Sequence, residues 1–337
     1  MKNTTQPTTT PSFFLGIDVG KKDLFCHIIS PDKPSSERFD NTPAGVKSLL
    51  KWLAATAPAA RASACLEQTG HYGDAIAAAL YGSGIHSLHL VNPQRVKAFG
   101  NQKLRRNKSD TADAKLIAAF LMAEQPGLRP WQPRSPRQQR ITDLNRHADA
   151  LTRDAARLKT RLSADPDKTV AASIARTIKF LEKEIKAVRK DIHSTIKADA
   201  GLLARYKLLR TIPGIGDVAA QTVIGELPDL SEFEDARQLA AWSGLTPRHY
   251  KSGTSGRSQT PITKVGSVHL RRAMFMPAMT ARMNNPLLKT FGDRLKENGK
   301  KPRQVIIAIM RKLLHQIYGI LKSGMPYNPE KRGFIGS

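Results

Sequence analysis

Short apolar runs alternate with amphipathic stretches over the first part of the chain, after a polar, Thr-rich beginning. One apolar run ends at Asp18 and another at Glu67, and turn residues bound both, as is typical of buried strands. Strands that alternate with helices predict an α/β sandwich whose sheet is partly antiparallel. The predicted elements are two strands within 13–30 joined by a tight turn, strands at 62–67 and 86–91, and helices at about 43–56, 73–82 and from 110 onward.

The periodicity changes after a proline-rich linker at 126–136. Apolar residues then recur at alternating steps of three and four, from Ile141 to Leu162 and, after a break, from Ile174 to Ile192. This spacing predicts two long helices in a coiled-coil arm, packed on itself or on another subunit. Basic residues lie mostly off the seam, on a face that is either solvated or in contact with phosphates, and the basic excess favours phosphates. They are Arg137, Arg140, Arg146, Arg153, Arg157, Lys159 and Arg161.

The remainder of the chain has mostly helical patterns. The segment Ile212-Pro-Gly-Ile-Gly resembles a helix-hairpin-helix turn, in which Gly214 and Gly216 allow a tight reversal and the next helix offers free N–H groups to a phosphate. A plain turn between two helices is the alternative. A basic stretch without acidic residues follows at 245–272, and an apolar helical stripe at 303–322 is most simply core packing.

Charge and composition narrow the class of partner. The 337 residues include 54 Lys and Arg against 28 Asp and Glu, a formal net charge of +26, which favours DNA or RNA over a membrane surface. We find no apolar run long enough to span a bilayer and no signal peptide. The two cysteines, Cys26 and Cys65, exclude a disulfide scaffold and a Cys-based zinc site. Both are expected to be buried thiols in a reducing cytoplasm.

Four carboxylates stand out in this basic chain: Asp18, Glu67, Asp110 and Asp113. Two end predicted strands, and the other two lie three residues apart on one face of a predicted helix. Acids that converge from several elements can hold two Mg²⁺ or Mn²⁺ ions for phosphoryl transfer.

Each acid also has a structural alternative. Asp110 fits a helix N-cap, Asp113 favours the helix dipole, Glu67 could pair with a Lys, and Asp18 could be a turn residue. The segment Gly16-Ile-Asp-Val-Gly is also similar to a strand-turn of actin-like ATPases, but no second such turn and no later Gly-Gly adenosine signature accompany it. The common order of four acids favours a metal site.

Taken together, these motifs resemble the DEDD-type insertion-sequence transposases, the RNA-guided bridge recombinases of bacterial mobile elements. The resemblance covers about 13–325. The motifs that carry it are Gly16-Ile-Asp-Val-Gly, Leu66-Glu-Gln-Thr-Gly-His-Tyr, Val91-Asn-Pro, Asn107-Lys-Ser-Asp-Thr-Ala-Asp-Ala, Ile212-Pro-Gly-Ile-Gly, Ala240-Ala-Trp-Ser-Gly-Leu-Thr-Pro-Arg, Ser252-Gly and Leu270-Arg-Arg-Ala-Met-Phe-Met-Pro-Ala-Met.

The resemblance implies a division of the chain into domains. A RuvC-like, RNase H-type catalytic domain at 13–130 would precede a coiled-coil arm at 131–203 and a mostly α-helical C-terminal transposase domain at 204–326, with tails at 1–12 and 327–337. It also implies that Ser252 is the nucleophile. From the residues alone Thr254, Ser255 and Ser258 are equally plausible hydroxyls.

The expected function is therefore that of a transposase which cleaves and exchanges DNA strands through a covalent phosphoserine, assisted by Mg²⁺. As the resemblance implies, its partners would be donor and target DNA, a guide RNA, and further copies of the chain in a dimer or tetramer. Because the acids and Ser252 lie in different domains, a complete site could draw on two subunits. A metal-dependent junction resolvase and a non-enzymatic architectural nucleic-acid binder are the alternatives. The residues predicted to bind nucleic acid are Lys103, Arg105, Arg106, Lys108, Arg248, Lys251, Arg257, Lys264, Arg271, Arg272, Gly214 and Gly216.

Overall fold

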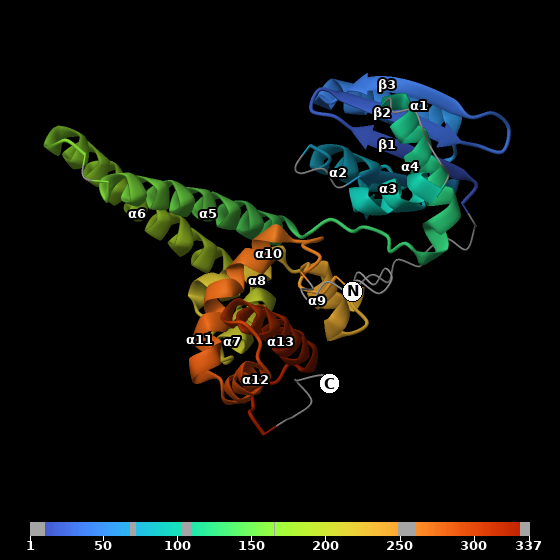
Figure 1. Ribbon diagram of the computed structural model, residues 1–337. Coiled ribbons are helices and arrows are strands. Elements are labelled where there is room, and N and C mark those ends of the chain that lie inside the picture. The colour runs from blue at the N-terminus through green and yellow to red at the C-terminus, as the bar shows by residue number, and fades with distance from the viewer. Residues whose placement is uncertain (1–10, 68–71, 103–109, 165, 249–260, 331–337) are drawn as a thin grey trace. The chain divides into compact units, whose positions relative to one another are not determined.

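The computed structural model describes residues 11–67, 72–102, 110–164, 166–248 and 261–330, with Asp110 described only by its place in a helix (Figure 1). The chain forms two compact units, Met1–Pro133 and Arg134–Ser337, which are described separately below. Within the described ranges, no helix combines the length and the apolar content that crossing a bilayer requires.

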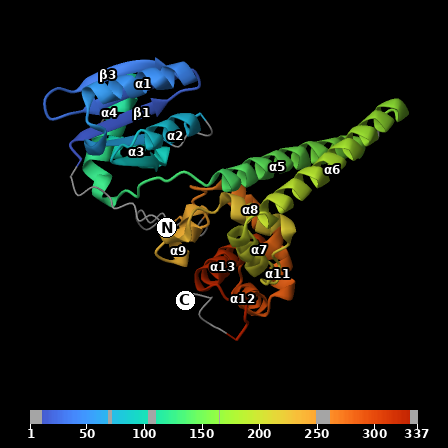
Figure 2. The ribbon, with the colours of Figure 1, turned by 180° about the vertical axis from the view of Figure 1, so that it is seen from behind.

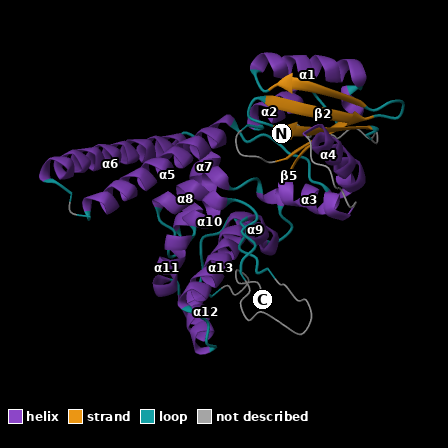
Figure 3. Ribbon diagram, turned by 45° about the horizontal axis from the view of Figure 1, so that its top comes forward, coloured by secondary structure: helices purple, strands orange, loops and turns teal. Residues whose placement is uncertain are grey.

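Unit 1 is built on a five-stranded mixed sheet with strand order β3-β2-β1-β4-β5 (Figure 3). The strands are β1 (Phe13–Val19), β2 (Asp23–Ile29), β3 (Ser35–Asp40), β4 (Ala62–Glu67) and β5 (Ser87–Val91). The first three are antiparallel neighbours, whereas β4 pairs in parallel with both β1 and β5. The predicted α/β class and the predicted antiparallel hairpin are confirmed.

Two elements of unit 1 were not predicted. Strand β3 has the sequence Ser-Ser-Glu-Arg-Phe-Asp and is mostly exposed, so it carries no apolar run that could reveal a strand. It forms because β2 offers it an open edge, with which it pairs from Ser35 to Asp40. Helix α3 (Pro93–Gln102) was also missed, since its sequence is mostly polar.

Helices cover both faces of this sheet. Helices α1 (Pro43–Thr56) and α2 (Asp74–Gly82) pack with the side chains of one face, including Leu15, Ile17 and Leu66. On the other face α3 and α4 (Asp110–Glu124) pack with Cys65 and Val91. The result is a three-layer sandwich in which each face of the sheet has its own hydrophobic core.

Unit 2 begins with two long helices, α5 (Pro136–Leu162) and α6 (Lys168–Lys197), which lie side by side as an antiparallel pair (Figures 1 and 2). Cross-contacts set the direction, because Arg189 Nη1 donates to Asn145 Oδ1 and Lys159 pairs with Glu182. Every seam position from Ile141 to Leu162 is buried or half-buried. Within this chain, therefore, the two predicted helices pair with each other, and the supercoil itself stays a prediction.

The rest of unit 2 is helical, as predicted. Its helices are α7 (Ala200–Arg210), α8 (Asp217–Glu226), α9 (Ala236–Trp242), α10 (Val268–Ala273), α11 (Phe275–Asn284), α12 (Pro286–Glu297) and α13 (Pro302–Ser323). Single 3₁₀ turns are η1 (Ala59–Arg61) and η2 (Gln125–Gly127) in unit 1 and η3 (Leu230–Glu232) in unit 2. Ile141 and Ile192 at the base of the arm share one core with Leu209 and Ile309. This core includes residues on both sides of the domain boundary predicted near 203. The boundary itself stays a prediction.

Candidate active site

Asp18 and Glu67 are neighbours at the same edge of the sheet. Strands β1 and β4 run parallel with Ile17 opposite Leu66, so the next residue of each strand places these two acids side by side at the carboxyl ends. Both are half-buried. Two carboxylates held together in this way favour a shared cation, because like charges at close range repel.

Both acids point to the face of the sheet that α3 and α4 cover. Side chains alternate along a strand, and Ile17 and Leu66 belong to the opposite core, so Asp18 and Glu67 face the other way. Cys65, two residues before Glu67, packs in the core formed with α3 and α4. Burial raises the pKa of the Cys65 thiol, and the Glu67 carboxylate raises it further.

Helix α4, which carries Asp113, packs closely against β1. A Cβ on Gly16 would overlap the carbonyl oxygen of Ala114 and the amide nitrogen of Ala118, so only glycine lets α4 lie this close to β1. Phe14, at the start of β1, packs against the core that includes Ile117 and Phe120 of α4. Helix α4, whose first turn carries Asp113, therefore lies directly against β1, and an approach of Asp113 to Asp18 stays a prediction.

The fourth predicted acid, Asp110, begins α4 one turn before Asp113. Its side chain lies outside the described residues. Among the side chains that are described, no group of three or more His, Cys, Asp or Glu is arranged to hold a metal ion. The all-carboxylate donor set is nevertheless the type that Mg²⁺ prefers, so the residues present fit the ion, and metal binding stays a prediction.

Asn41 supports this edge and was missed by sequence reasoning. Its amide Nδ2 donates to the carbonyl of Gly20, 2.9 Å away, and to that of Tyr72, 3.2 Å away. It thereby links the segment after β1 to the segment after β4. No sequence signal marks this role, because Asn41 reads as an ordinary residue before the start of α1.

Ser252 and several predicted nucleic-acid-binding residues lie outside the described residues: Lys103, Arg105, Arg106, Lys108, Lys251 and Arg257. The flanks of the Ser252 segment are described. The backbone N–H of Arg248 donates to Pro261 O at 2.7 Å, and that of Thr263 donates to Thr246 O at 2.9 Å. These antiparallel contacts hold the two ends of the segment together between α9 and α10.

The predicted cations near these flanks differ in their surroundings. Arg271 Nη1 donates to the carbonyl of Ser243 at 2.9 Å, and burial, followed by repulsion from Arg272, lowers the pKa of the Arg271 guanidinium. Arg272 is exposed, and Lys264 has a positive φ of 56°. Arg271 thus braces the end of α9 in this structure, and nucleic-acid binding by these residues stays a prediction.

The turn at Gly214 has a packing explanation. Gly214 has a φ of 104°, and a Cβ there would lie 2.6 Å from the Cβ of Ala281 on α11. Asp217, the first residue of α8, accepts from the Tyr206 hydroxyl at 2.7 Å and pairs with Arg210 at 2.8 Å. The reversal between α7 and α8 is present, whereas phosphate binding by Gly214 and Gly216 stays a prediction.

Several basic residues of the arm are engaged within the fold. Arg146 forms an ion pair with Glu226 of α8, with Nε 3.0 Å from Oε1, and the Glu226 side chain is only 3% exposed. Arg137 pairs with Asp199, and Lys159 with Glu182. The phosphate-contact interpretation of the arm does not account for these pairs, because each has an acid partner within the chain.

Comparisons with known proteins show the family to which this chain belongs. A family of DEDD-type transposases of IS110 elements matches residues 15–165, and the family described as "Transposase IS116/IS110/IS902 family" matches residues 206–293. The chain is also similar to the "Pilin gene-inverting protein" of Moraxella bovis, with 31% identity over 317 residues that cover 94% of this chain and 97% of that protein. The chain belongs to the IS116/IS110/IS902 family of transposases.

This transposase has further relatives. It is 25% identical to the transposase for insertion sequence element IS1328 of Yersinia enterocolitica, over 72% of this chain and 79% of that one. Among solved structures it is similar to Thermus thermophilus RuvC in complex with a Holliday junction substrate, with 18% identity, a TM-score of 0.28, and coverage of 36% of this chain and 99% of that chain. As a member of this family, it is an enzyme of DNA recombination that cleaves and transfers DNA strands.

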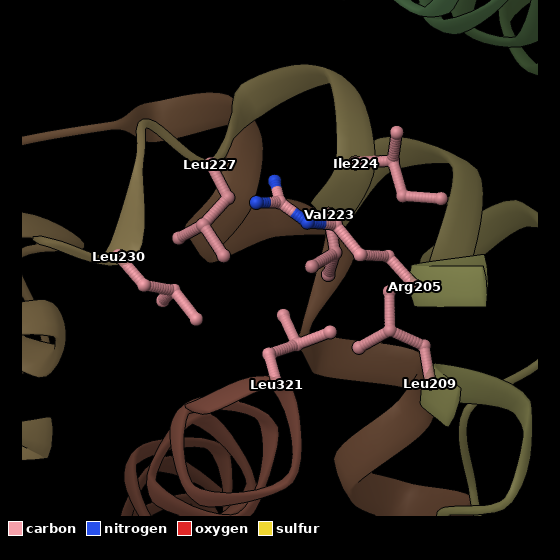
Figure 4. A pocket seen from close by; sticks show the side chains of 7 residues that line it. All are labelled: Arg205, Leu209, Val223, Ile224, Leu227, Leu230 and Leu321. Carbon is pink, nitrogen blue, oxygen red and sulfur yellow. The ribbon is translucent and has the colours of Figure 1, made fainter. Parts of the chain in front are cut away.

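The transposase also has a small hollow in unit 2, between α7, α8 and α13 (Figure 4). Apolar side chains line it, with Arg205 at one side. Its volume is about 10 Å³, room for one water at most. It is therefore not a site for a nucleotide or another small substrate.

Proposed function

We propose that this transposase cuts and rejoins DNA through a covalent phosphoserine at Ser252, with Asp18, Glu67, Asp110 and Asp113 holding divalent metal. The observation that carries the proposal is the placement of Asp18 and Glu67 side by side at the carboxyl ends of adjacent parallel strands, with α4, whose first turn carries Asp113, packed against β1. An RNase H-type fold for unit 1 is part of the proposal, supported by its mixed five-stranded sheet.

In the proposed reaction, Ser252 supplies the nucleophile and the four acids hold the metal. The serine Oγ attacks phosphorus, the bond from phosphorus to the 3′ oxygen breaks, and that oxygen leaves with the proton as a free 3′ hydroxyl. A 3′ hydroxyl from another strand then attacks the phosphoserine, which forms the new DNA bond and regenerates the serine. Divalent metal held by the acids would polarise the phosphate and offset its charge in both steps. No external energy source is needed, because each bond broken is replaced by an equivalent bond.

The proposal extends to partners and assembly. A structured guide RNA would select donor and target DNA by base pairing, and copies of the chain would assemble so that several strands are cut together. The arm seam gives no separate support for assembly, because α5 and α6 pair with each other within one chain. The name of the Moraxella relative, a gene-inverting protein, supports an exchange of strands without net loss of DNA. Sequencing the RNA that co-purifies with the protein tests the guide directly.

The decisive experiment traps the covalent intermediate. DNA carrying a label on the strand 3′ of the cut is incubated with enzyme and Mg²⁺ and then denatured. We expect label attached to protein at Ser252, and loss of both label and cleavage in Ser252→Ala. Ser255→Ala, in the same segment, is the matched control and should retain both. Cleavage that persists in Ser252→Ala without attached label would show that water is the nucleophile, as in a resolvase, and would overturn the proposal.

A further inference from the structure

Four cationic side chains of unit 2 lie close together on α13 and on the two helices α9 and α12 that pack against it: Arg237, Arg294, Arg311 and Lys312. We call them the α13 cation cluster. The Lys312 ammonium and the Arg294 guanidinium lie against the same aromatic ring, with Nζ and Cζ each 5.7 Å from the centroid of Phe291. Burial, and then repulsion from Arg311, Arg294 and Arg237, lower the pKa of Lys312. The cluster therefore concentrates positive charge from three helices at one place.

The positive charge of this cluster acts on the buried side chain of His315. His315 lies one turn along α13 from Arg311 and Lys312, is 5% exposed, and neither ring nitrogen has a hydrogen-bond partner in the described part of the chain. Burial first, then Lys312 and Arg311, lower its pKa to about 4, against the opposing effect of Asp235. Asp235 also caps α9, where its carboxylate accepts from the N–H of Gln238. The carboxylate of Asp235 therefore does not cancel the positive potential at His315.

Cations packed this closely repel one another, and an anion bound among them would relieve the repulsion. Duplex DNA presents about one phosphate charge per 1.7 Å of its axis, a density that suits several cations around a single ring. DNA is the polyanion that a transposase must hold, and membership of the family rests on the comparisons rather than on the proposed phosphoserine or guide RNA. None of the four cations belongs to the residues that the sequence predicted to bind nucleic acid.

We propose that Arg237, Arg294, Arg311 and Lys312 form a binding surface for the phosphate backbone of duplex DNA. Such a surface positions the duplex without reading its sequence, because phosphates are the same at every step. None of its residues is among the predicted acids or the predicted serine nucleophile, and the proposal deepens the transposase function by naming residues of unit 2 that would contact its substrate.

The test measures the salt dependence of DNA binding by the full-length protein. The probe is a random-sequence DNA duplex of about three helical turns, and binding is followed by fluorescence anisotropy over a range of KCl concentrations. The double variant Arg237→Gln/Arg294→Gln should weaken binding equally for unrelated sequences and lower the slope of log K against log salt by about 1 for each phosphate that is no longer neutralised. The double variant Lys289→Gln/Lys296→Gln is the matched control, since it also removes two exposed cations, both of α12 and outside the cluster. It should leave the slope unchanged.

Two results would overturn the proposal. One is an equal effect of Lys289→Gln/Lys296→Gln and Arg237→Gln/Arg294→Gln, which would mean a diffuse field rather than a binding surface. The other is a loss confined to an RNA duplex of matched length, with DNA binding unchanged, which would assign the cluster to RNA. A second measurement, independent of affinity, is the pKa of the His315 imidazole, followed by its NMR resonance. This pKa should rise when DNA is added, because the phosphates offset the charge of the cations.

The binding assay does not depend on DNA cleavage. Failure of the phosphoserine mechanism would therefore not alter its result.

Discussion

Glu226 of unit 2 and the strand-end acids of unit 1 differ in their surroundings. In unit 2 the carboxylate of Glu226, at the end of α8, is almost fully buried and meets the Arg146 guanidinium at 3.0 Å. In unit 1 the register of β1 and β4 places Asp18 beside Glu67, so that one acid neighbours another, and α4, which carries Asp113, packs against β1. A buried acid with its own cation serves the fold, because the chain supplies both charges. Acids gathered with acids suit a cation from outside the chain, which is the arrangement that metal-assisted phosphoryl transfer needs.

The comparison predicts its largest effect at Glu67. Glu67→Gln removes one carboxylate charge from the strand-end group while it keeps the size of the side chain. We expect metal-dependent cleavage of DNA to fall by at least about a hundredfold, because stabilisation of the phosphate charge is the main work of the site. Stability should not fall, since the change relieves repulsion between neighbouring acids. Cleavage assays and thermal unfolding on the same preparation check both expectations.

Glu37→Gln is the control for this variant, because Glu37 is an exposed residue of β3 in the same sheet. It should change neither cleavage nor stability. If Glu67→Gln cleaved at the wild-type rate, or lost stability in parallel with activity, Glu67 would be a structural acid and the contrast between the two units would disappear.

Glu226 should behave in the reverse manner. Glu226→Ala leaves the Arg146 guanidinium without its partner at the junction of α5 and α8, and we expect the free energy of unfolding to fall by about 3 kcal/mol. Binding of metal to unit 1 should not change. Glu182→Ala removes an ion pair of similar length with Lys159, 2.7 Å long, but both side chains are about half exposed. That control should be indistinguishable from wild type in chemical denaturation, because exposed pairs contribute little.

The sequence predicted that Asp18 and Glu67 end strands of unit 1, but it did not predict the ion pair of unit 2, for a physical reason. Asp18 and Glu67 each end an apolar run, and adjacent parallel strands place such ends together without any knowledge of distant contacts. Arg146 and Glu226 are 80 residues apart, and only the packing of α5 on α8 joins them. From the sequence Arg146 therefore read as one more basic residue of the arm.

Two glycines illustrate the same limit. Gly214 was assigned to a phosphate-binding turn, while its positive φ and its close approach to Ala281 give it a role in packing. Gly16 was seen only as part of a motif, although it sets how near α4 comes to β1. A contact between distant segments leaves no local pattern, so periodicity could place the helices and strands but not these approaches.

Gly16 gives the next prediction, because it sets how closely α4, which carries Asp113, lies against β1. A Cβ at this position meets backbone atoms of Ala114 and Ala118, which cannot rotate away as a side chain would. Gly16→Ala should therefore lower the free energy of unfolding by about 2 kcal/mol, as overpacking does, and also reduce cleavage by displacing α4. Gly82→Ala, in α2, meets nothing within 4 Å and should leave stability unchanged or slightly raised. Equal stability of the two variants would contradict the close approach of α4 to β1.

The smallest effect concerns His315 of unit 2. This base is buried close to two cations of the same helix, as the acid Glu67 of unit 1 lies beside another acid. Its pKa is lowered in the folded chain to about 4, by burial and then by Lys312 and Arg311. Because the unfolded chain binds the proton more readily, stability is complete above the unfolded pKa near 6.5 and falls as the pH drops toward 4. Between about pH 8 and about pH 5.5 the loss in the free energy of unfolding should be about 1 kcal/mol.

Other histidines contribute in the same direction, since burial also lowers the pKa of His27, His89 and His269. The measurement is therefore the difference between wild type and His315→Leu in urea unfolding at each pH. A constant difference would mean that His315 titrates alike in both states, and that the α13 cation cluster does not act on it.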